Sequence, residues 1–124
     1  MTLLTFFLLS VAGGVGAVAR LFIDAFVTAR LGNRYPFGTT IINITGSFLL
    51  GLVAAAATPS ETSFRLIIGM GLIGGYTTFS TASFETVRLL RARRIGAALS
   101  NGFGMLLVCV LAGCVGSLAA GAFY

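Results

Sequence analysis

The stretch Gly74-Gly75-Tyr76-Thr77-Thr78-Phe79-Ser80-Thr81 decides how this chain folds, because it stands in the middle of an uncharged run over residues 66–84. That run is long enough to cross a bilayer as a helix. Its centre has two glycines, which weaken a helix, and then four Ser or Thr residues among the five residues 77–81, whose hydroxyls compete for the backbone hydrogen bonds. Open backbone at membrane depth is tolerated only beside protein or a water-filled cavity. The stretch therefore predicts a membrane helix that opens at its midpoint, next to an ion or solute site.

The composition of the whole chain is that of a membrane protein. Of its 124 residues 57% are hydrophobic and 9% are charged, whereas a soluble domain has about 25% charged residues. Charge-free runs cover residues 1–19, 35–60, 66–84 and 95–124. We predict an all-α membrane protein with one domain, residues 1–124, and four transmembrane helices near residues 3–27, 37–57, 64–88 and 96–122. A cleaved signal peptide is the alternative for the first run, but the run has no basic n-region and three more follow it.

The basic residues are all arginines, and they are unevenly distributed. The loops after the first and third expected helices contain six of them, whereas the opposite side has only Arg65; the six are Arg30, Arg34, Arg88, Arg91, Arg93 and Arg94. Basic loops stay cytoplasmic, so we expect a multi-pass protein of a prokaryotic cell membrane with both termini outside. In a chain mostly buried in lipid, this charge does not indicate a nucleic-acid partner.

Ionisable groups are too few for coupled transport or catalysis. The only acids are Asp24, Glu61 and Glu85, and histidine is absent. A proton-coupled transporter usually needs an ionisable group near the midplane, and none is expected there. The pattern favours passive conduction and gives no sign of an enzyme.

The two cysteines both lie in the last expected helix. Cys109 and Cys114 are five residues apart, which is about 500° of rotation around the helix axis, so they point to different faces. We interpret them as packing residues rather than a disulfide or metal site.

Three polar residues within or near the expected helices each allow two interpretations. Arg20, about two turns inside the first helix, would cost roughly 2.5–3.5 kcal/mol at a helix centre. It either reaches back to the first loop or raises the anion concentration at an aqueous vestibule. Asn43 either joins two helices, a bond of about 0.6 kcal/mol, or offers its amide to an anion. Glu85 either caps its helix or pairs with an arginine near the third loop.

Three segments together resemble the Fluc (CrcB) fluoride channels. They are Gly13-Gly14-Val15-Gly16-Ala17-Val18-Ala19-Arg20, then Pro36-Phe37-Gly38-Thr39 leading to Asn43 and Gly46-Ser47-Phe48, and then Gly74 to Thr81 followed by Glu85. The resemblance implies passive export of fluoride, and hence resistance to its toxicity, through an antiparallel dimer with two narrow pores. It also implies a structural Na⁺ ion at the broken third helix, held by the backbone carbonyls of Gly74 and Thr77 of each subunit.

The same resemblance implies roles for further side chains. Phe79 and Asn43 would face the pore, with Ser80 and Thr81 as polar lining, Arg20 at a vestibule and Glu85 as a polar group at the helix end. Phe79 would meet the anion with its ring edge, which is the positive part of the ring quadrupole. The family's second pore phenylalanine corresponds to Ala82 here, so the pair is incomplete.

The last helix departs from the family as well. Met105, Cys109 and Gly113 replace its polar line, and only Ser100 and Asn101 remain polar near the start. The arginine bias predicts insertion in one orientation, so an antiparallel dimer would need a second Fluc-type subunit of opposite bias. We therefore favour a heterodimer with a partly degraded pore over a homodimer.

Two other function classes remain for comparison. Small multidrug-resistance exporters have a similar length and four helices, but they exchange protons through a glutamate in the first helix. Here that helix has no glutamate, and Asp24 lies near its end. A structural or accessory membrane protein would leave the hydroxyl-rich interruption unexplained.

Overall fold

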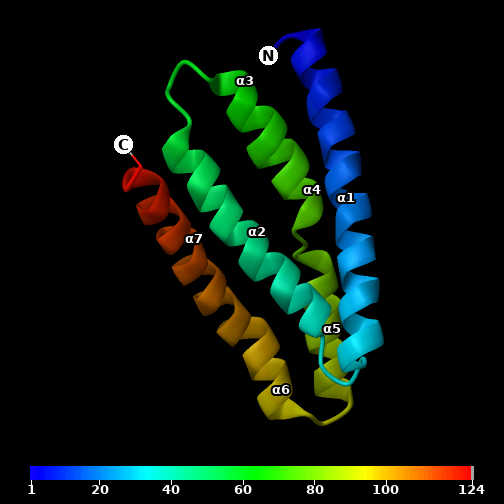
Figure 1. The fold of residues 1–124 in the computed structure, drawn as a ribbon. Coiled ribbons are helices and arrows are strands. Elements are labelled where there is room, and N and C mark those ends of the chain that lie inside the picture. The colour runs from blue at the N-terminus through cyan, green and yellow to red at the C-terminus, as the bar shows by residue number, and fades with distance from the viewer. Residues whose placement is uncertain (124) are drawn as a thin grey trace.

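The computed structural model describes residues 1–123, which form an all-helical bundle without strands (Figure 1). Along the chain, α1 (Leu3–Leu31) and α2 (Phe37–Ala56) are followed by a segment that joins α3 (Thr62–Phe64), η1 (Arg65–Ile73) and α4 (Gly74–Tyr76). After three non-helical residues, α5 (Ser80–Arg91) leads to a last segment that joins α6 (Ile95–Leu99), η2 (Ser100–Gly104) and α7 (Met105–Gly121). The all-α prediction is confirmed.

Three helices of the described chain are long and apolar enough to cross a membrane: Leu3–Leu31, Phe37–Ala56 and Ile95–Gly121. They agree with the predicted ranges 3–27, 37–57 and 96–122, except that α1 continues for one more turn. It ends at Gly32, whose φ of 77° is favoured by glycine and whose N–H donates to the Thr28 carbonyl at 2.8 Å.

The predicted helix over residues 64–88 consists of two pieces in the structure. Helical structure covers residues 62–76 and resumes at Ser80, so only residues 77–79 are non-helical. The interruption lies within the predicted stretch 74–81, but Gly74 and Gly75, which were expected to weaken the helix, both remain helical. The interruption begins at Thr77, where φ is −78° and ψ is 160°.

The glycines serve close packing between helices. A Cβ on Gly75 would lie 2.1 Å from the Gly13 carbonyl oxygen, and one on Gly16 would lie 2.1 Å from the Leu72 carbonyl oxygen. Likewise, a Cβ on Gly51 would lie 2.1 Å from the carbonyl oxygen of Gly113. Small residues permit this approach of backbones in membrane helices. They bring η1 and α4 against α1, and α7 against α2.

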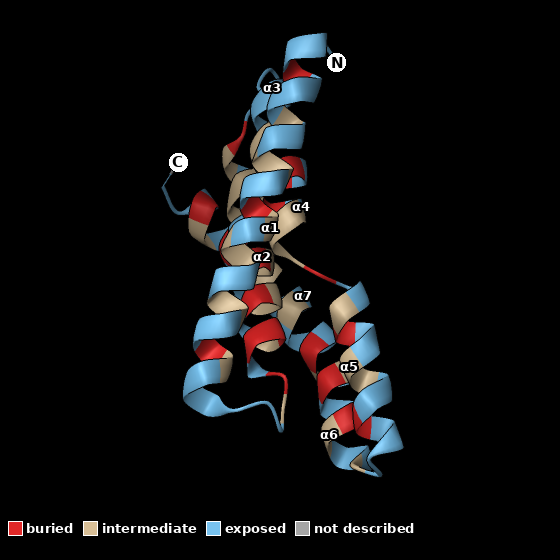
Figure 2. Cartoon of the chain, turned by 90° about the vertical axis from the view of Figure 1, so that its right-hand side faces the viewer, coloured by how far each residue is buried: buried red, intermediate tan, exposed pale blue. Residues whose placement is uncertain are grey.

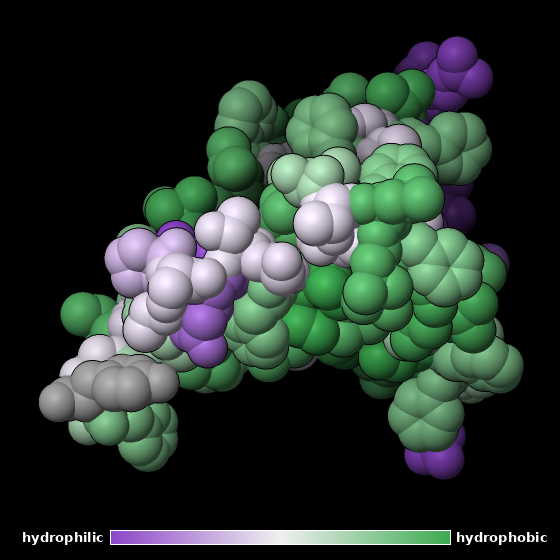
Figure 3. All heavy atoms as spheres, turned by 90° about the horizontal axis from the view of Figure 1, so that it is seen from above, coloured by the Kyte–Doolittle hydropathy of each residue, from purple (hydrophilic) through white to green (hydrophobic). Residues whose placement is uncertain are grey.

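Large apolar side chains cover the outside of the bundle. Phe22 is 72% exposed and Leu118 is 75% exposed. Exposed residues follow the outer faces of α1 and α5 (Figure 2). Seen from the end with both termini, the surface is mostly hydrophobic, with hydrophilic groups in small patches (Figure 3). Such a surface is suited to lipid or to a partner subunit rather than to water.

The two arginine-rich loops lie together at one end of the bundle, and the termini and the α2–α3 loop lie at the other (Figure 1). Arg88 Nη2 donates to the Asn33 carbonyl at 3.3 Å, and the Arg94 guanidinium donates to the Arg34 carbonyl. These bonds join residues 55 and 60 positions apart. The predicted gathering of six arginines on one side is therefore present.

Candidate functional site

Asn43 of α2 holds the interruption in place with two hydrogen bonds to Thr78. Its Nδ2 donates to the Thr78 carbonyl at 2.8 Å, and its Oδ1 accepts from the Thr78 N–H at 2.8 Å. Backbone groups that a continuous helix would satisfy are thus satisfied by a side chain, as a membrane interior requires. Of the two interpretations of Asn43, the interhelical bond is the one that the structure contains. The remaining amide proton is directed to Met105 Sδ, 3.5 Å from Nδ2.

The threonines of the interruption end one helical piece and begin the next. The Thr77 N–H and hydroxyl both donate to the Ile73 carbonyl, at 2.9 and 3.1 Å. The Thr78 hydroxyl oxygen accepts from the Thr81 N–H at 3.2 Å, which is the bond of a side chain that caps a helix N-terminus. The hydroxyl-rich sequence therefore supplies the caps that make a break between two helices stable.

This arrangement leaves backbone oxygens without their helical donors. Thr78 N–H bonds to Asn43 instead of the Gly74 carbonyl, and Thr81 N–H bonds to the Thr78 hydroxyl instead of the Thr77 carbonyl. Hard cations prefer such oxygen ligands. Within residues 1–123, no group of three or more His, Cys, Asp or Glu residues could hold a metal ion. The backbone oxygens of Gly74 and Thr77 thus have the chemistry for a hard cation, although two oxygens alone do not complete a coordination shell.

A cavity of about 620 Å³ lies beside the interruption, between α2, α5 and the η2–α7 segment. Its polar lining residues are Asn43, Ser47, Thr77, Thr78, Ser83, Thr86 and Asn101. The other lining residues are apolar or sulfur-containing and include Phe79, Ala82, Phe103, Met105 and Cys109. The cavity contains no carboxylate and no arginine. It can offer hydrogen bonds and aromatic edges to a small solute, but its lining has no carboxylate that could exchange a proton.

The structure brings together only part of the predicted site. Three predicted residues line the cavity: Asn43, Thr77 and Phe79. Phe79 is 87% exposed, so it stands at the cavity with little of its own chain covering it. The other predicted residues lie outside the cavity lining: Gly74, Ser80, Thr81, Arg20 and Glu85.

Arg20 and Glu85 occupy different surroundings. Arg20 is half-buried on α1, one turn past Gly16, which packs against Tyr76. This register places Arg20 close to the level of the interruption. Glu85 Oε1 accepts from the Thr39 hydroxyl at 3.1 Å, and its Oε2 is buried without a partner in the described chain. The partner of Glu85 is therefore a hydroxyl of α2, and within residues 1–123 Glu85 forms no helix-end ion pair with an arginine.

Of the residues in the last helical segment that the sequence analysis discussed, only some line the cavity. Met105 and Cys109 do face the cavity, but Gly113 instead packs against Gly51. Asn101 is fully buried, and its Nδ2 donates to the Ala82 carbonyl at 3.2 Å and to the Thr86 hydroxyl at 2.9 Å. Ser100 lies elsewhere, with its hydroxyl 3.0 Å from the Tyr35 hydroxyl.

Sequence reasoning gave no site role to Thr78, although it lies inside the hydroxyl-rich stretch, and it missed three further polar residues of the lining: Ser47, Ser83 and Thr86. Their spacing was a usable signal. Ser47 is one helical turn after Asn43, and the other two are four and seven residues after Phe79, so each shares a helix face with a predicted site residue.

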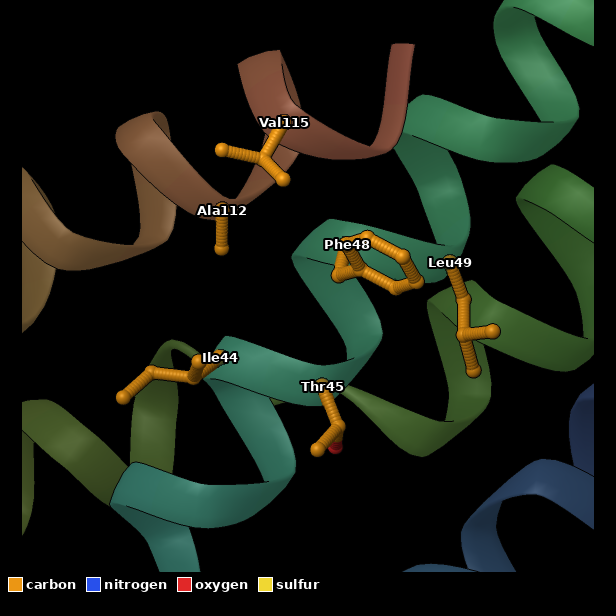
Figure 4. A pocket seen from close by; sticks show the side chains of 6 residues that line it. All are labelled: Ile44, Thr45, Phe48, Leu49, Ala112 and Val115. Carbon is orange, nitrogen blue, oxygen red and sulfur yellow. The ribbon is translucent and has the colours of Figure 1, made fainter. Parts of the chain in front are cut away.

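A second hollow, of about 480 Å³, has no comparable chemistry. It is lined by α2 and α7 residues that are apolar except for one threonine: Ile44, Thr45, Phe48, Leu49, Ala112 and Val115 (Figure 4). The Thr45 hydroxyl donates to the Ile41 carbonyl at 2.7 Å, so it is already engaged. This hollow offers no polar group set for recognising an ion.

Comparison with known proteins identifies one matching family and several similar proteins. The family model described as CrcB-like protein, Camphor Resistance (CrcB), matches residues 7–117. The chain is 52% identical over 112 residues to the fluoride-specific ion channel FluC 1 of Leifsonia xyli subsp. xyli, covering 87% of this chain and 80% of that protein. It is 36% identical over 117 residues to FluC of Sorangium cellulosum, covering 92% of each chain. It is 44% identical over 110 residues to FluC 2 of Cutibacterium acnes, covering 85% of this chain and 88% of that protein.

Proposed function

Because this chain belongs to the CrcB-like protein family, we propose that it is a subunit of a membrane channel that exports cytoplasmic fluoride passively and thereby gives resistance to fluoride. One observation supports this most directly. A cavity with polar lining lies beside a break between two helices, inside a bundle whose outer surface is apolar. In this proposal the segments 62–76 and 80–91 together cross the membrane as the third of four spans.

Passive conduction is sufficient for this task. Fluoride is the base of a weak acid whose neutral form crosses membranes and dissociates inside the cell. The inside-negative potential then drives the anion outward with about 2.3 kcal/mol per charge per 100 mV. No proton-exchanging residue is required, which agrees with a cavity lining that holds no carboxylate.

Phe79 and Asn43 are the groups that we propose to meet the anion. The ring edges of Phe79 carry partial positive charge, and the Asn43 amide is a hydrogen-bond donor. A pore that strips water from a hydrated anion must replace those bonds. Ser80 and Thr81 remain predicted lining residues for the assembled channel, and Arg20 a predicted vestibule cation, because a partner subunit would extend the cavity of the single chain.

A structural Na⁺ ion would suit the interruption. The carbonyls of Gly74 and Thr77 lack their helical donors, and a facing subunit would double the number of oxygens. When bound, the ion would supply a buried positive charge beside the anion path, which lowers the free energy of dehydrated fluoride. The chain's own part in this is to hold those carbonyls open through the Asn43–Thr78 bonds.

We further propose an antiparallel heterodimer in a prokaryotic cell membrane. Six arginines lie at one end of the bundle and Arg65 at the other, so this chain inserts with both termini outside. An antiparallel partner must then be a Fluc-type chain with the opposite bias. The departures at Ala82, Met105 and Cys109 also fit a subunit in which one pore is partly lost and the partner keeps the other.

Fluoride efflux from liposomes, measured with a fluoride electrode, tests both parts of the proposal. The chain is purified alone and also co-expressed with a Fluc-type chain of reversed loop charge. We expect efflux from the pair and little from the single chain. Rapid efflux from the single chain would refute the obligate pair but not the channel. Absence of efflux from both preparations, each shown to be folded and inserted, would refute the channel.

A further inference from the structure

The hydrogen bonds of Asn43 fix the orientation of its side-chain amide. The reciprocal bonds with Thr78 need Nδ2 opposite the carbonyl and Oδ1 opposite the N–H, both at 2.8 Å. Exchanging oxygen and nitrogen would face acceptor with acceptor and donor with donor. One amide proton is therefore committed to Thr78, and the second points away from the interruption. Under the proposed function, that second proton is the one available to an anion.

Met105 covers this proton. Its Sδ lies 3.5 Å from Asn43 Nδ2, and its side chain is 7% exposed at the cavity wall. A thioether is only a weak acceptor, and methionine has three rotatable side-chain bonds. A cavity of about 620 Å³ adjoins it, so the side chain has space to turn away. The contact satisfies the amide when no anion is present, and it can be exchanged.

We propose that Met105 is a displaceable cap that competes with fluoride for the Asn43 amide and thereby sets the affinity of this subunit's site. This inference rests on the proposed function and concerns one residue at which the resemblance implies a departure from the family. An anion replaces the sulfur because a hydrogen bond to an ion is roughly twice as strong as a neutral one. The exchange releases the Met105 side chain into the cavity. Removing the sulfur removes the competitor, so fluoride binds more tightly.

Met105→Leu is the decisive variant, because leucine has nearly the same volume and no acceptor. In the conducting assembly we expect the half-saturating fluoride concentration to fall roughly two- to fivefold, the equivalent of one weak hydrogen bond. Maximal flux should change less than the half-saturating concentration. Met70→Leu is the matched control, since Met70 is 66% exposed on η1 and does not line the cavity. In an Asn43→Ala background, Met105→Leu should have no further effect on affinity.

A spectroscopic measurement tests the contact without relying on flux. Asparagine labelled with ¹⁵N marks only three side chains in this chain: Asn33, Asn43 and Asn101. Without fluoride, Met105→Leu should shift the Asn43 amide resonances and leave those of Asn33 unchanged. Adding fluoride to the wild-type protein should move the Asn43 resonances as well.

The outcomes are separable. An unshifted Asn43 amide in Met105→Leu, or an unaltered half-saturating concentration in a conducting assembly, would overturn the cap and leave the channel intact. A shifted Asn43 amide in an assembly that neither conducts nor binds fluoride would refute the channel, and with it the competition that the cap requires.

Discussion

Replacing Gly75 with alanine tests the contact that positions the interrupted segment. A Cβ on Gly75 would lie 2.1 Å from the Gly13 carbonyl oxygen and 2.9 Å from the Gly13 carbonyl carbon and Cα, whereas ordinary contact begins at 3.4 Å. All three neighbours are backbone atoms, so no side chain can rotate away. Helices α1 and α4 must therefore separate by more than an ångström.

The expected loss of stability follows from this overlap. Overpacking of a well-packed site typically costs about 1–3 kcal/mol, and we expect the upper end because the obstacle is backbone. Alanine also gains roughly 1 kcal/mol over glycine in helix propensity. Gly14→Ala is a matched control, because it makes the same change on α1 with nothing within 4 Å of the new Cβ. The propensity gain is common to both variants, so their difference of about 3 kcal/mol isolates the overlap.

Reversible unfolding of both variants in detergent micelles measures this difference. Gly75→Ala should unfold at a clearly lower denaturant concentration than Gly14→Ala, and its fluoride flux should fall because α4 leads directly into Thr77. Equal unfolding midpoints for the two variants would show that α1 and α4 do not pack as described.

Three further outcomes are expected. Phe79→Ile should lower fluoride efflux about tenfold or more with assembly unchanged on a sizing column, because an aliphatic side chain has no positive edge; normal flux would exclude Phe79 from the pore. Replacing Na⁺ with a large organic cation should lower the melting temperature of the assembly if the Gly74 and Thr77 carbonyls hold Na⁺, and a Na⁺-independent melting temperature would contradict that site. The backbone N–H and the hydroxyl of Thr58 both donate to Glu61 Oε2 at 2.9 Å, which together with Arg65 holds the pKa of Glu61 below its usual 4.5. Its stabilising effect is therefore present above pH 4.5 and lost as the pH falls through the lowered pKa, so Glu61→Gln should be slightly less stable than wild type at neutral pH and equal to it at strongly acid pH.

The positions of the helices, and the gathering of arginines at one end of the bundle, could be predicted from local sequence alone. Charge-free runs of membrane length predicted three of the observed helices within about a turn, because the hydrocarbon core imposes both length and apolarity on any helix that crosses it. The partition of arginines likewise predicted which loops lie together, and the bonds of Arg88 and Arg94 to the first loop agree with it.

The role of the glycines was not accessible in the same way. Gly74 and Gly75 indicated an opening of the helix, yet both are helical. At position 75 there is no room for a Cβ, because the backbone of Gly13 lies against it. A missing Cβ permits both an unusual backbone conformation and a close neighbour, and sequence spacing does not say which neighbour is present.

From its sequence alone, this chain was determined to be a helical membrane protein with a polar interruption near residues 74–81 and an arginine-rich end. Only the tertiary structure decided what Asn43 does, since its partners Thr78 and Met105 lie 35 and 62 residues away. The physical reason is that periodicity and charge act within one helix, whereas a hydrogen bond between helices depends on how far each has rotated and slid against its neighbour. That relative placement follows from the backbone contacts at Gly13, Gly51 and Gly75, which exist only once the helices have packed.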